Sequence, residues 1–244
     1  MDLDDIPVGR VLSRREALAF LGATGALLFL GCSDSAASST GGEVSSSCLV
    51  RPELTEGPYY VDEELNRSDI RGDPVTGAVK TGALLALTFN VSRASSSACE
   101  PLADAVVDLW HCDALGAYSD VADPGFNTAG QKFLRGYQVT GSDGVARFTT
   151  IYPGWYHGRA VHLHFKIRSA ASATTAYEFT SQLFFDDALT DQVHAEEPYA
   201  AKGQRDLRNA GDGIYKQGGS QLVLDVTPTS EGYAATFNIA VDTA

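Results

Sequence analysis

Two histidines separated by one leucine are the residues of this 244-residue chain best placed to do chemistry. His162-Leu163-His164 lies in an apolar, β-prone run from Ala160 to Ile167. Successive side chains of a strand point to opposite faces, so both imidazoles would share one face, roughly 7 Å apart along the strand. Imidazole is a common ligand of zinc, copper, iron and nickel. The pair therefore indicates a metal site, with ordinary strand histidines as the alternative.

Two tyrosines upstream of this motif are further candidates. Tyr156 belongs to the loop Pro153-Gly154-Trp155-Tyr156-His157, which runs directly into the strand of the two histidines. Tyr118 ends the run WHCDALGAY, just after another predicted strand. They stand out because they occur together with the two histidines and within the phrases around them. The alternative for each is an ordinary half-buried ring.

Short β runs separated by turn residues must position these side chains. The turn Gly141–Gly144, with the sequence GSDG, predicts a hairpin, and only Asp187–Arg208 is expected to hold one or two short helices. Many short alternating strands favour an all-β fold, a sandwich of two antiparallel sheets. Its long connections, 113–132 and 187–220, could carry function. The predicted strands are Leu84–Val91, Ala105–His111, Phe133–Thr140, Val145–Ile151, Val161–Arg168, Glu178–Phe185, Gln221–Val226 and Ala234–Val241.

Composition and charge exclude some classes of partner. The hydrophobic content of 44% and the charged content of 20% are ordinary for a globular protein, and the length suffices for one good core. The net charge is −13, and the sequence contains no basic stripe. Because nucleic acids and anionic membranes attract basic surfaces, we expect no nucleic-acid partner and no membrane contact through surface charge.

The first 32 residues resemble an export signal. Arg14-Arg15 precedes an uncharged run from Ala17 to Cys32, which is similar to a twin-arginine signal, and Leu30-Gly31-Cys32 resembles the lipidation site of bacterial lipoproteins. We therefore expect an exported protein, in the cell envelope, periplasm or medium, with a lipid anchor on Cys32. Cleavage near Ser35-Ala36-Ala37 is the alternative. Residues 33–47 predict a flexible Ser/Gly-rich tether, and residues 48–244 form the expected domain.

Three cysteines follow Cys32. In an oxidising compartment the simplest arrangement is one disulfide and one free thiol. We favour Cys48 with Cys99 and leave Cys112 free, although the other pairings stay open. The chain has no CxxC pattern, so a thiolate zinc site is not expected.

Five phrases of the sequence, in this order, resemble the intradiol ring-cleavage dioxygenases, the family of catechol and protocatechuate 3,4-dioxygenases. The resemblance is greatest to exported bacterial relatives. The phrases are TEGPYY at 55–60, VVDLWHCDALGAYSD at 106–120, FLRGYQVTGSDG at 133–144, PGWY with RAVHLHF between 153 and 165, and SQLFF at 181–185.

This resemblance implies a non-haem Fe(III) ion held by two tyrosines and two histidines. The matching positions are Tyr118, Tyr156, His162 and His164. Two phenolates favour Fe(III), whereas the Fe(II) oxygenases use two histidines and one carboxylate.

The resemblance also implies roles beyond the metal ligands. Arg159 and Gln182 match residues beside the substrate, with Arg159 stabilising the electron-rich ring and Tyr156 leaving the metal to accept a substrate proton. Tyr59, with Gly57 and Pro58, matches the segment that lines the substrate mouth. The two remaining nearby histidines, His111 and His157, are expected on the polar surface.

The implied reaction cleaves a catechol ring between its two hydroxyls with O₂ and gives a cis,cis-muconate-type diacid. The partners would be a catecholic small molecule and O₂. The ring substituents, and the choice between monomer and homodimer, stay open. The alternative function is a lipid-tethered β-sandwich binding module without a catalytic metal. A cupin-type site is disfavoured because Lys166-Ile167-Arg168-Ser169 follows His164 where that family expects a glutamate.

Overall fold

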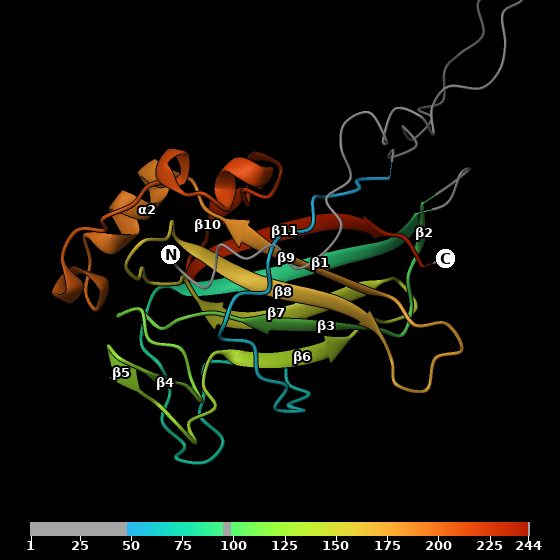
Figure 1. The fold of residues 1–244 in the computed structure, drawn as a ribbon, viewed down its shortest axis with the longest axis horizontal. Coiled ribbons are helices and arrows are strands. Elements are labelled where there is room, and N and C mark those ends of the chain that lie inside the picture. The colour runs from blue at the N-terminus through green and yellow to red at the C-terminus, as the bar shows by residue number, and fades with distance from the viewer. Residues whose placement is uncertain (1–47, 95–98, 244) are drawn as a thin grey trace, which may run out of the picture.

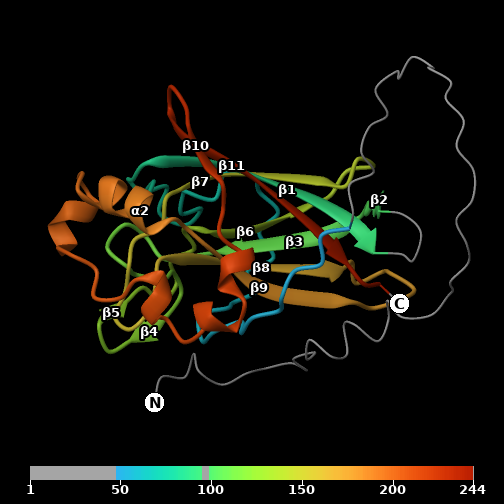
Figure 2. The same cartoon turned by 90° about the horizontal axis from the view of Figure 1, so that it is seen from above.

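The computed structural model describes residues 48–94 and 99–243, and these form a sandwich of two β-sheets (Figures 1 and 2). The all-β prediction is therefore confirmed. The first sheet contains β1 (Leu84–Ala94), β2 (Cys99–Pro101), β7 (Val145–Ile151), β10 (Val226–Pro228) and β11 (Gly232–Val241). The second contains β3 (Ala105–Trp110), β6 (Arg135–Val139), β8 (His162–Ser169) and β9 (Glu178–Phe184). A separate hairpin pairs β4 (Ala122–Asp123) with β5 (Phe126–Asn127).

Between the named strands of the described residues, the pairing is antiparallel with one exception at the centre of the first sheet. There β1 runs parallel to β11, in a register from Leu84 opposite Gly232 to Arg93 opposite Val241. A parallel pair needs a connection that leaves the sheet and returns. Most of the chain lies between these two strands, including the whole second sheet. The predicted pair of antiparallel sheets thus needs this one correction.

The core lies between the two sheets and is rich in aromatic rings. Along β1, buried and more exposed residues alternate, as expected of a strand with one face in the core. Phe89 of β1 contacts Phe165 of β8 at 5.4 Å between ring centroids and Phe237 of β11 at 6.0 Å. The Phe89–Phe165 contact joins the two sheets, and the Phe89–Phe237 contact packs neighbouring strands of the first sheet.

The second sheet is buried on both faces, and this explains how a polar site forms on it. The inward face of β8 contributes Leu163, Phe165 and Ile167 to the core. The opposite face carries His162 and His164, which are also buried. The segment 52–61 crosses this outer face, where Leu54 N donates to Thr180 O at 3.1 Å. The two histidines are therefore shielded from water without belonging to the apolar core.

Two long connections meet at one end of the sandwich. The connection between β3 and β6 contains the β4–β5 hairpin, and the one after β9 contains α2 (Asp187–His194). Both lie at the end where β8 begins (Figures 1 and 2). Asp186 caps α2 by accepting from the backbone N–H groups of Ala188 and Leu189, both at 2.9 Å. Short 3₁₀ turns follow at Tyr199–Lys202, Asn209–Gly211, Tyr215–Gln217 and Gly219–Gln221, so the prediction of short helices in Asp187–Arg208 is confirmed.

The predicted strand Gln221–Val226 is wrong. Its alternation is real, because Leu222 and Leu224 are both buried. However, the backbone there makes only an isolated bridge, in which Phe184 N donates to Leu222 O and Leu224 N donates to Phe184 O, both at 2.9 Å. The alternation of buried residues therefore arises from packing against β9, and the regular strand β10 begins only at Val226.

The cysteine prediction is confirmed, since Cys48 and Cys99 form a disulfide and Cys112 is a buried free thiol. The predicted export signal (1–32) and tether (33–47) lie outside the described residues. Within residues 48–94 and 99–243, no helix is long and apolar enough to cross a membrane.

Candidate active site

The two histidines of β8 turn their Nε2 atoms toward each other, 3.0 Å apart. Both side chains are almost completely buried, and burial lowers the pKa of each well below its ordinary value, so both are neutral at pH 7. His162 Nδ1 lies 2.7 Å from Ala160 O. A carbonyl oxygen only accepts, so Nδ1 carries the proton and Nε2 of His162 keeps a lone pair. This is the usual orientation of a metal-binding histidine.

Tyr156 brings a phenol oxygen to the same place. Its Oη lies 3.3 Å from His162 Nε2, and the two ring centroids are 5.5 Å apart. Tyr118 arrives from the loop after β3 and is 1% exposed. Its ring centroid is 5.7 Å from that of Tyr156 and 6.1 Å from that of His164. The structure therefore brings all four predicted ligands together.

The two loops that carry the tyrosines are held against each other. A Cβ atom on Gly154 would lie only 2.4 Å from Ala114 O, so only glycine permits this approach. Lys202, from the connection after β9, joins both loops because its Nζ donates to Leu115 O at 2.5 Å and to Trp155 O at 2.6 Å. The positions of the two phenols are therefore coupled through the backbone.

Arg159 and Gln182 lie beside the four rings and contact each other. Arg159 is 3% exposed, and its Nη2 donates to Gln182 Oε1 at 2.6 Å. Its Nη1 lies 3.4 Å from Tyr156 Oη. Gln182 is fixed in turn, because its Nε2 donates to Thr55 O at 2.9 Å. Both predicted residues therefore point into the same polar cluster as the ligand candidates.

Sequence reasoning missed Trp110, whose indole stacks on His164. The ring centroids are 5.1 Å apart and the planes differ by 11°. The register of the sheet causes this contact, since Trp110 of β3 and Gln182 of β9 lie directly opposite His164 on its two sides. The ring of Tyr60 also packs against the indole, at 4.8 Å between centroids. The available sequence signals were its place near the end of the predicted strand Ala105–His111 and within the phrase at 106–120.

Tyr59 stacks on Tyr118, with ring centroids 4.5 Å apart, and its edge faces Tyr156 at 6.1 Å. Its hydroxyl donates to Asp123 Oδ2 of the β4–β5 hairpin at 2.8 Å. Tyr59 thus covers two of the candidate ligands, and its contact with substrate stays a prediction. Gly57 and Pro58 form the turn before it, where Gly57 has φ = 72° and its N donates to Thr55 Oγ1 at 3.2 Å.

The two other histidines near the motif in sequence, His111 and His157, do not join the cluster. His157 is exposed, as predicted. The surface prediction for His111 is wrong, because its side chain is completely buried. Its Nε2 lies 2.6 Å from Thr150 Oγ1 and its Nδ1 lies 2.8 Å from Cys112 O, so both nitrogens are already used.

The residues present fit a single metal ion. Two nitrogens bound at about 2.1 Å and at right angles would lie about 3.0 Å apart, which matches the separation of the two Nε2 atoms. Among the described residues, no group of three or more His, Cys, Asp or Glu side chains converges. The donor set is therefore two imidazoles and two phenols, without the carboxylate of an Fe(II) facial triad. Hard phenol oxygens are suited to a trivalent ion.

Comparison with known proteins gives the family. The sequence matches the family described as "Dioxygenase" over residues 55–209. An intradiol ring-cleavage dioxygenase from Tetranychus urticae has the same fold, with 29% identity, a TM-score of 0.70, and coverage of 80% of this chain and 96% of that one. This chain belongs to the intradiol ring-cleavage dioxygenases.

Two further proteins are similar to this chain. The dioxygenase domain of a dioxygenase and carbohydrate-binding fusion from Streptomyces sp. SirexAA-E is 27% identical, with a TM-score of 0.56 over 80% of this chain and 99% of that one. Catechol 1,2-dioxygenase 1 of Acinetobacter lwoffii is 28% identical over 162 residues, 56% of this chain and 49% of that protein. The chain thus spans about half the length of this curated relative.

Proposed function

We propose that the chain is a non-haem Fe(III) dioxygenase that cleaves a catechol between its two hydroxyls with O₂ and forms a cis,cis-muconate-type diacid. The observation that carries the proposal is the meeting of His162 Nε2 with His164 Nε2 at 3.0 Å and with Tyr156 Oη at 3.3 Å, beside the ring of Tyr118. A site of this composition is unusual for a purely structural cluster, since two buried imidazoles gain little by facing each other.

These four side chains would hold the iron. When bound, Fe(III) would withdraw electron density from a coordinated catecholate and make its ring reactive toward O₂. The protein supplies the orientation. His162 is held by Ala160 O and His164 by the Trp110 stack, so neither imidazole needs to reorganise.

Proton transfer is assigned to Tyr156. Its Oη lies 3.4 Å from the guanidinium of Arg159, which stabilises the phenolate form of the side chain. A phenolate there is placed to accept a proton from an incoming catechol hydroxyl. Arg159 contributes a second effect, because a fixed positive charge in a water-poor site stabilises negative charge that develops on the ring.

Water is excluded by rings and by the segment over the second sheet. Tyr59 covers Tyr118, and Trp110 covers His164. Both contacts lower the local dielectric and strengthen the interaction of Arg159 with a bound anion. Tyr59 also lies between Asp123 and the cluster, so it is our candidate for contact with the substrate ring.

Oxygen uptake tests the proposal. Iron-loaded protein is given catechol, protocatechuate and hydroxyquinol in turn, and the product is identified by its absorption and mass. A muconate-type diacid supports intradiol cleavage, whereas a yellow semialdehyde would indicate extradiol cleavage. Tyr118→Phe should lose most activity, while Tyr137→Phe, a half-buried tyrosine on β6, should keep it. Full activity in Tyr118→Phe would remove Tyr118 from the ligand set.

The alternative of a metal-free binding module gives a different result in the same preparation. Tyrosinate bound to Fe(III) absorbs in the visible. Protein that stays colourless with added iron and consumes no O₂ would favour the binding module.

We also propose that the protein is exported by a twin-arginine route and anchored by a lipid on Cys32. The disulfide between Cys48 and Cys99 supports export, because disulfides persist in oxidising compartments. Metabolic labelling with a radioactive fatty acid tests the anchor. Wild-type protein should carry the label and Cys32→Ala should not, whereas equal labelling of both would contradict the assignment.

A further inference from the structure

A buried carboxylate outside the predicted site contacts Arg159. Asp212 lies in the connection after β9, three residues beyond the part of the chain that matches the family. It is completely buried, and its Oδ2 accepts from Arg159 Nε at 2.9 Å. A buried pair of this kind needs further hydrogen bonds to compensate its lost hydration.

Asp212 has these bonds, and they fix its orientation. Oδ2 also accepts from Ala160 N at 2.7 Å, next to Arg159 in sequence. Oδ1 accepts from Ile214 N at 2.7 Å and from Tyr215 N at 2.9 Å. Both oxygens are therefore committed, and the carboxylate cannot rotate without breaking at least two bonds.

The orientation of Asp212 sets the orientation of Arg159. A guanidinium is planar and presents its donors in a rigid fork. With Nε on Asp212 and Nη2 on Gln182 at 2.6 Å, the plane is defined by two contacts on different elements. Nη1 is then directed at Tyr156 Oη, 3.4 Å away.

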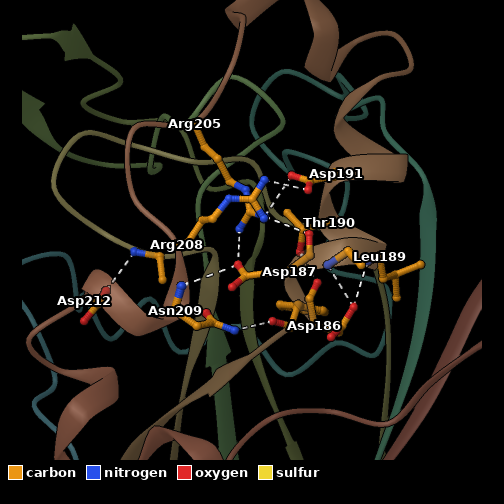
Figure 3. Close-up of polar contacts among 12 residues, drawn as sticks. Asp186, Asp187, Leu189, Thr190, Asp191, Arg205, Arg208, Asn209 and Asp212 are labelled. Atoms are coloured by element: carbon orange, nitrogen blue, oxygen red, sulfur yellow. Dashed lines mark hydrogen bonds and ion pairs between the residues drawn. The ribbon is translucent and has the colours of Figure 1, made fainter.

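The segment that carries Asp212 is itself anchored. Asn209 Nδ2 donates to Phe185 O at 2.7 Å, at the end of β9. Figure 3 shows Arg205 and Arg208 reaching from this segment to the acidic side chains of α2. Arg205 contacts both Asp187 and Asp191 at 2.5 and 2.9 Å. The carboxylate is thus held in place by the fold as well as by its own bonds.

We propose that Asp212 is a positioning residue for the reaction: it holds the Arg159 guanidinium in the plane that places Nη1 at Tyr156 and at the substrate. The inference rests on the proposed function and adds to it a residue from the long connection after β9. Asp212 does not touch the reacting atoms, so it acts through Arg159 alone.

The test uses Asp212→Asn in the full chain. An amide cannot accept from Arg159, Ala160 and both turn amides at once, so the guanidinium loses its fixed plane. We expect kcat/KM for the best catechol to fall about 10- to 100-fold, the range expected for a misplacement of about 1 Å. Asp206→Asn is the matched control, because Asp206 lies in the same segment and accepts from Gly158 N at 3.3 Å without touching Arg159. It should stay within about twofold of wild type.

A double-variant cycle separates positioning from a general structural role. If Asp212 acts through Arg159, then Arg159→Ala with Asp212→Asn is no slower than Arg159→Ala alone. If the two losses multiply, the inference is overturned. Anaerobic catechol titration, followed by the visible band, gives a readout without turnover, and the affinity should fall in Asp212→Asn and not in Asp206→Asn.

Urea unfolding of the iron-free variants adds a readout that needs neither iron nor substrate. The effects of Asp212→Asn and Arg159→Ala should be non-additive, and additivity would contradict the contact itself. If Asp212→Asn does not fold, Asp212→Ser replaces it, since a hydroxyl still caps the turn at Ile214 and Tyr215. Wild-type protein that binds and turns over no catechol would overturn the proposed function together with the inference. Active wild type with unchanged Asp212→Asn kinetics would overturn the inference alone.

Discussion

At the scale of single residues, each candidate ligand is oriented by a second contact. His162 donates to Ala160 O, and His164 stacks on Trp110. Tyr156 faces the guanidinium of Arg159, and Tyr118 stacks on Tyr59. The ligand candidates were predictable because strand alternation and the matching phrases depend on local sequence. Trp110 and Asp212 were not predictable. The contact of Trp110 with His164 depends on strand register, and Asp212 lies 53 residues after Arg159 in the sequence.

Trp110 gives a prediction at this scale. Trp110→Ala removes a buried indole that touches His164 and Tyr60, so it should lower the free energy of unfolding by about 3–5 kcal/mol. Trp110→Phe keeps a ring against the imidazole and should be destabilised clearly less. Urea unfolding of the iron-free proteins measures both. Equal losses in the two variants would contradict a stabilising contribution from a ring packed on His164.

At the scale of elements, sequence predicted strands better than their partners. The strands β1, β3, β7, β8 and β9 appear within a few residues of their predicted bounds. The parallel pairing of β1 with β11 was missed, because alternation along a strand carries no information on direction. The segment Gln221–Val226 was predicted as a strand for the opposite reason. Its buried and exposed residues alternate, but its backbone forms only an isolated bridge and no regular strand pairing.

His111, directly after β3, gives a prediction on the contact between elements. It joins the two sheets through Thr150 of β7, and burial lowers its pKa to about 4. The unfolded chain binds a proton below about pH 6.5 while the folded chain does not. Stability should therefore fall as the pH drops from about 6.5 to 4, with His111 contributing up to about 1.4 kcal/mol per pH unit.

Urea unfolding at several pH values isolates this contribution. His111→Gln should show a shallower pH dependence than wild type between pH 6.5 and 4. His157→Gln, which removes an exposed histidine, is the matched control. Identical slopes in wild type and His111→Gln would contradict the assignment.

At the scale of the whole molecule, the sandwich serves as a rigid support with the chemistry on one end of one outer face. The long connections after β3 and β9 both reach this end (Figure 1). The first contains Tyr118 and the second contains Asp212. The disulfide between Cys48 and Cys99 ties the first described residue to β2. Since β2 and α2 lie at opposite ends of the sandwich (Figure 1), we expect the disulfide to affect the stability of the fold and not the geometry of the site.

The contribution of the disulfide to stability can be predicted from its sequence separation of 51 residues. Cross-linking a loop of this length restricts the unfolded chain, and its removal typically costs about 2–4 kcal/mol. The double variant Cys48→Ser with Cys99→Ser should unfold at lower urea while keeping wild-type kcat/KM once iron-loaded. Loss of activity in protein that is still folded would show that the disulfide supports the site after all.

Iron titration of the metal-free protein, followed by visible absorption, most directly tests whether two phenols and two imidazoles share one Fe(III). We predict a visible band that saturates at one iron per chain, weakens or shifts in Tyr118→Phe and in Tyr156→Phe, and is unchanged in Tyr137→Phe. A protein that binds no iron, or binds it without a visible band, would contradict the site.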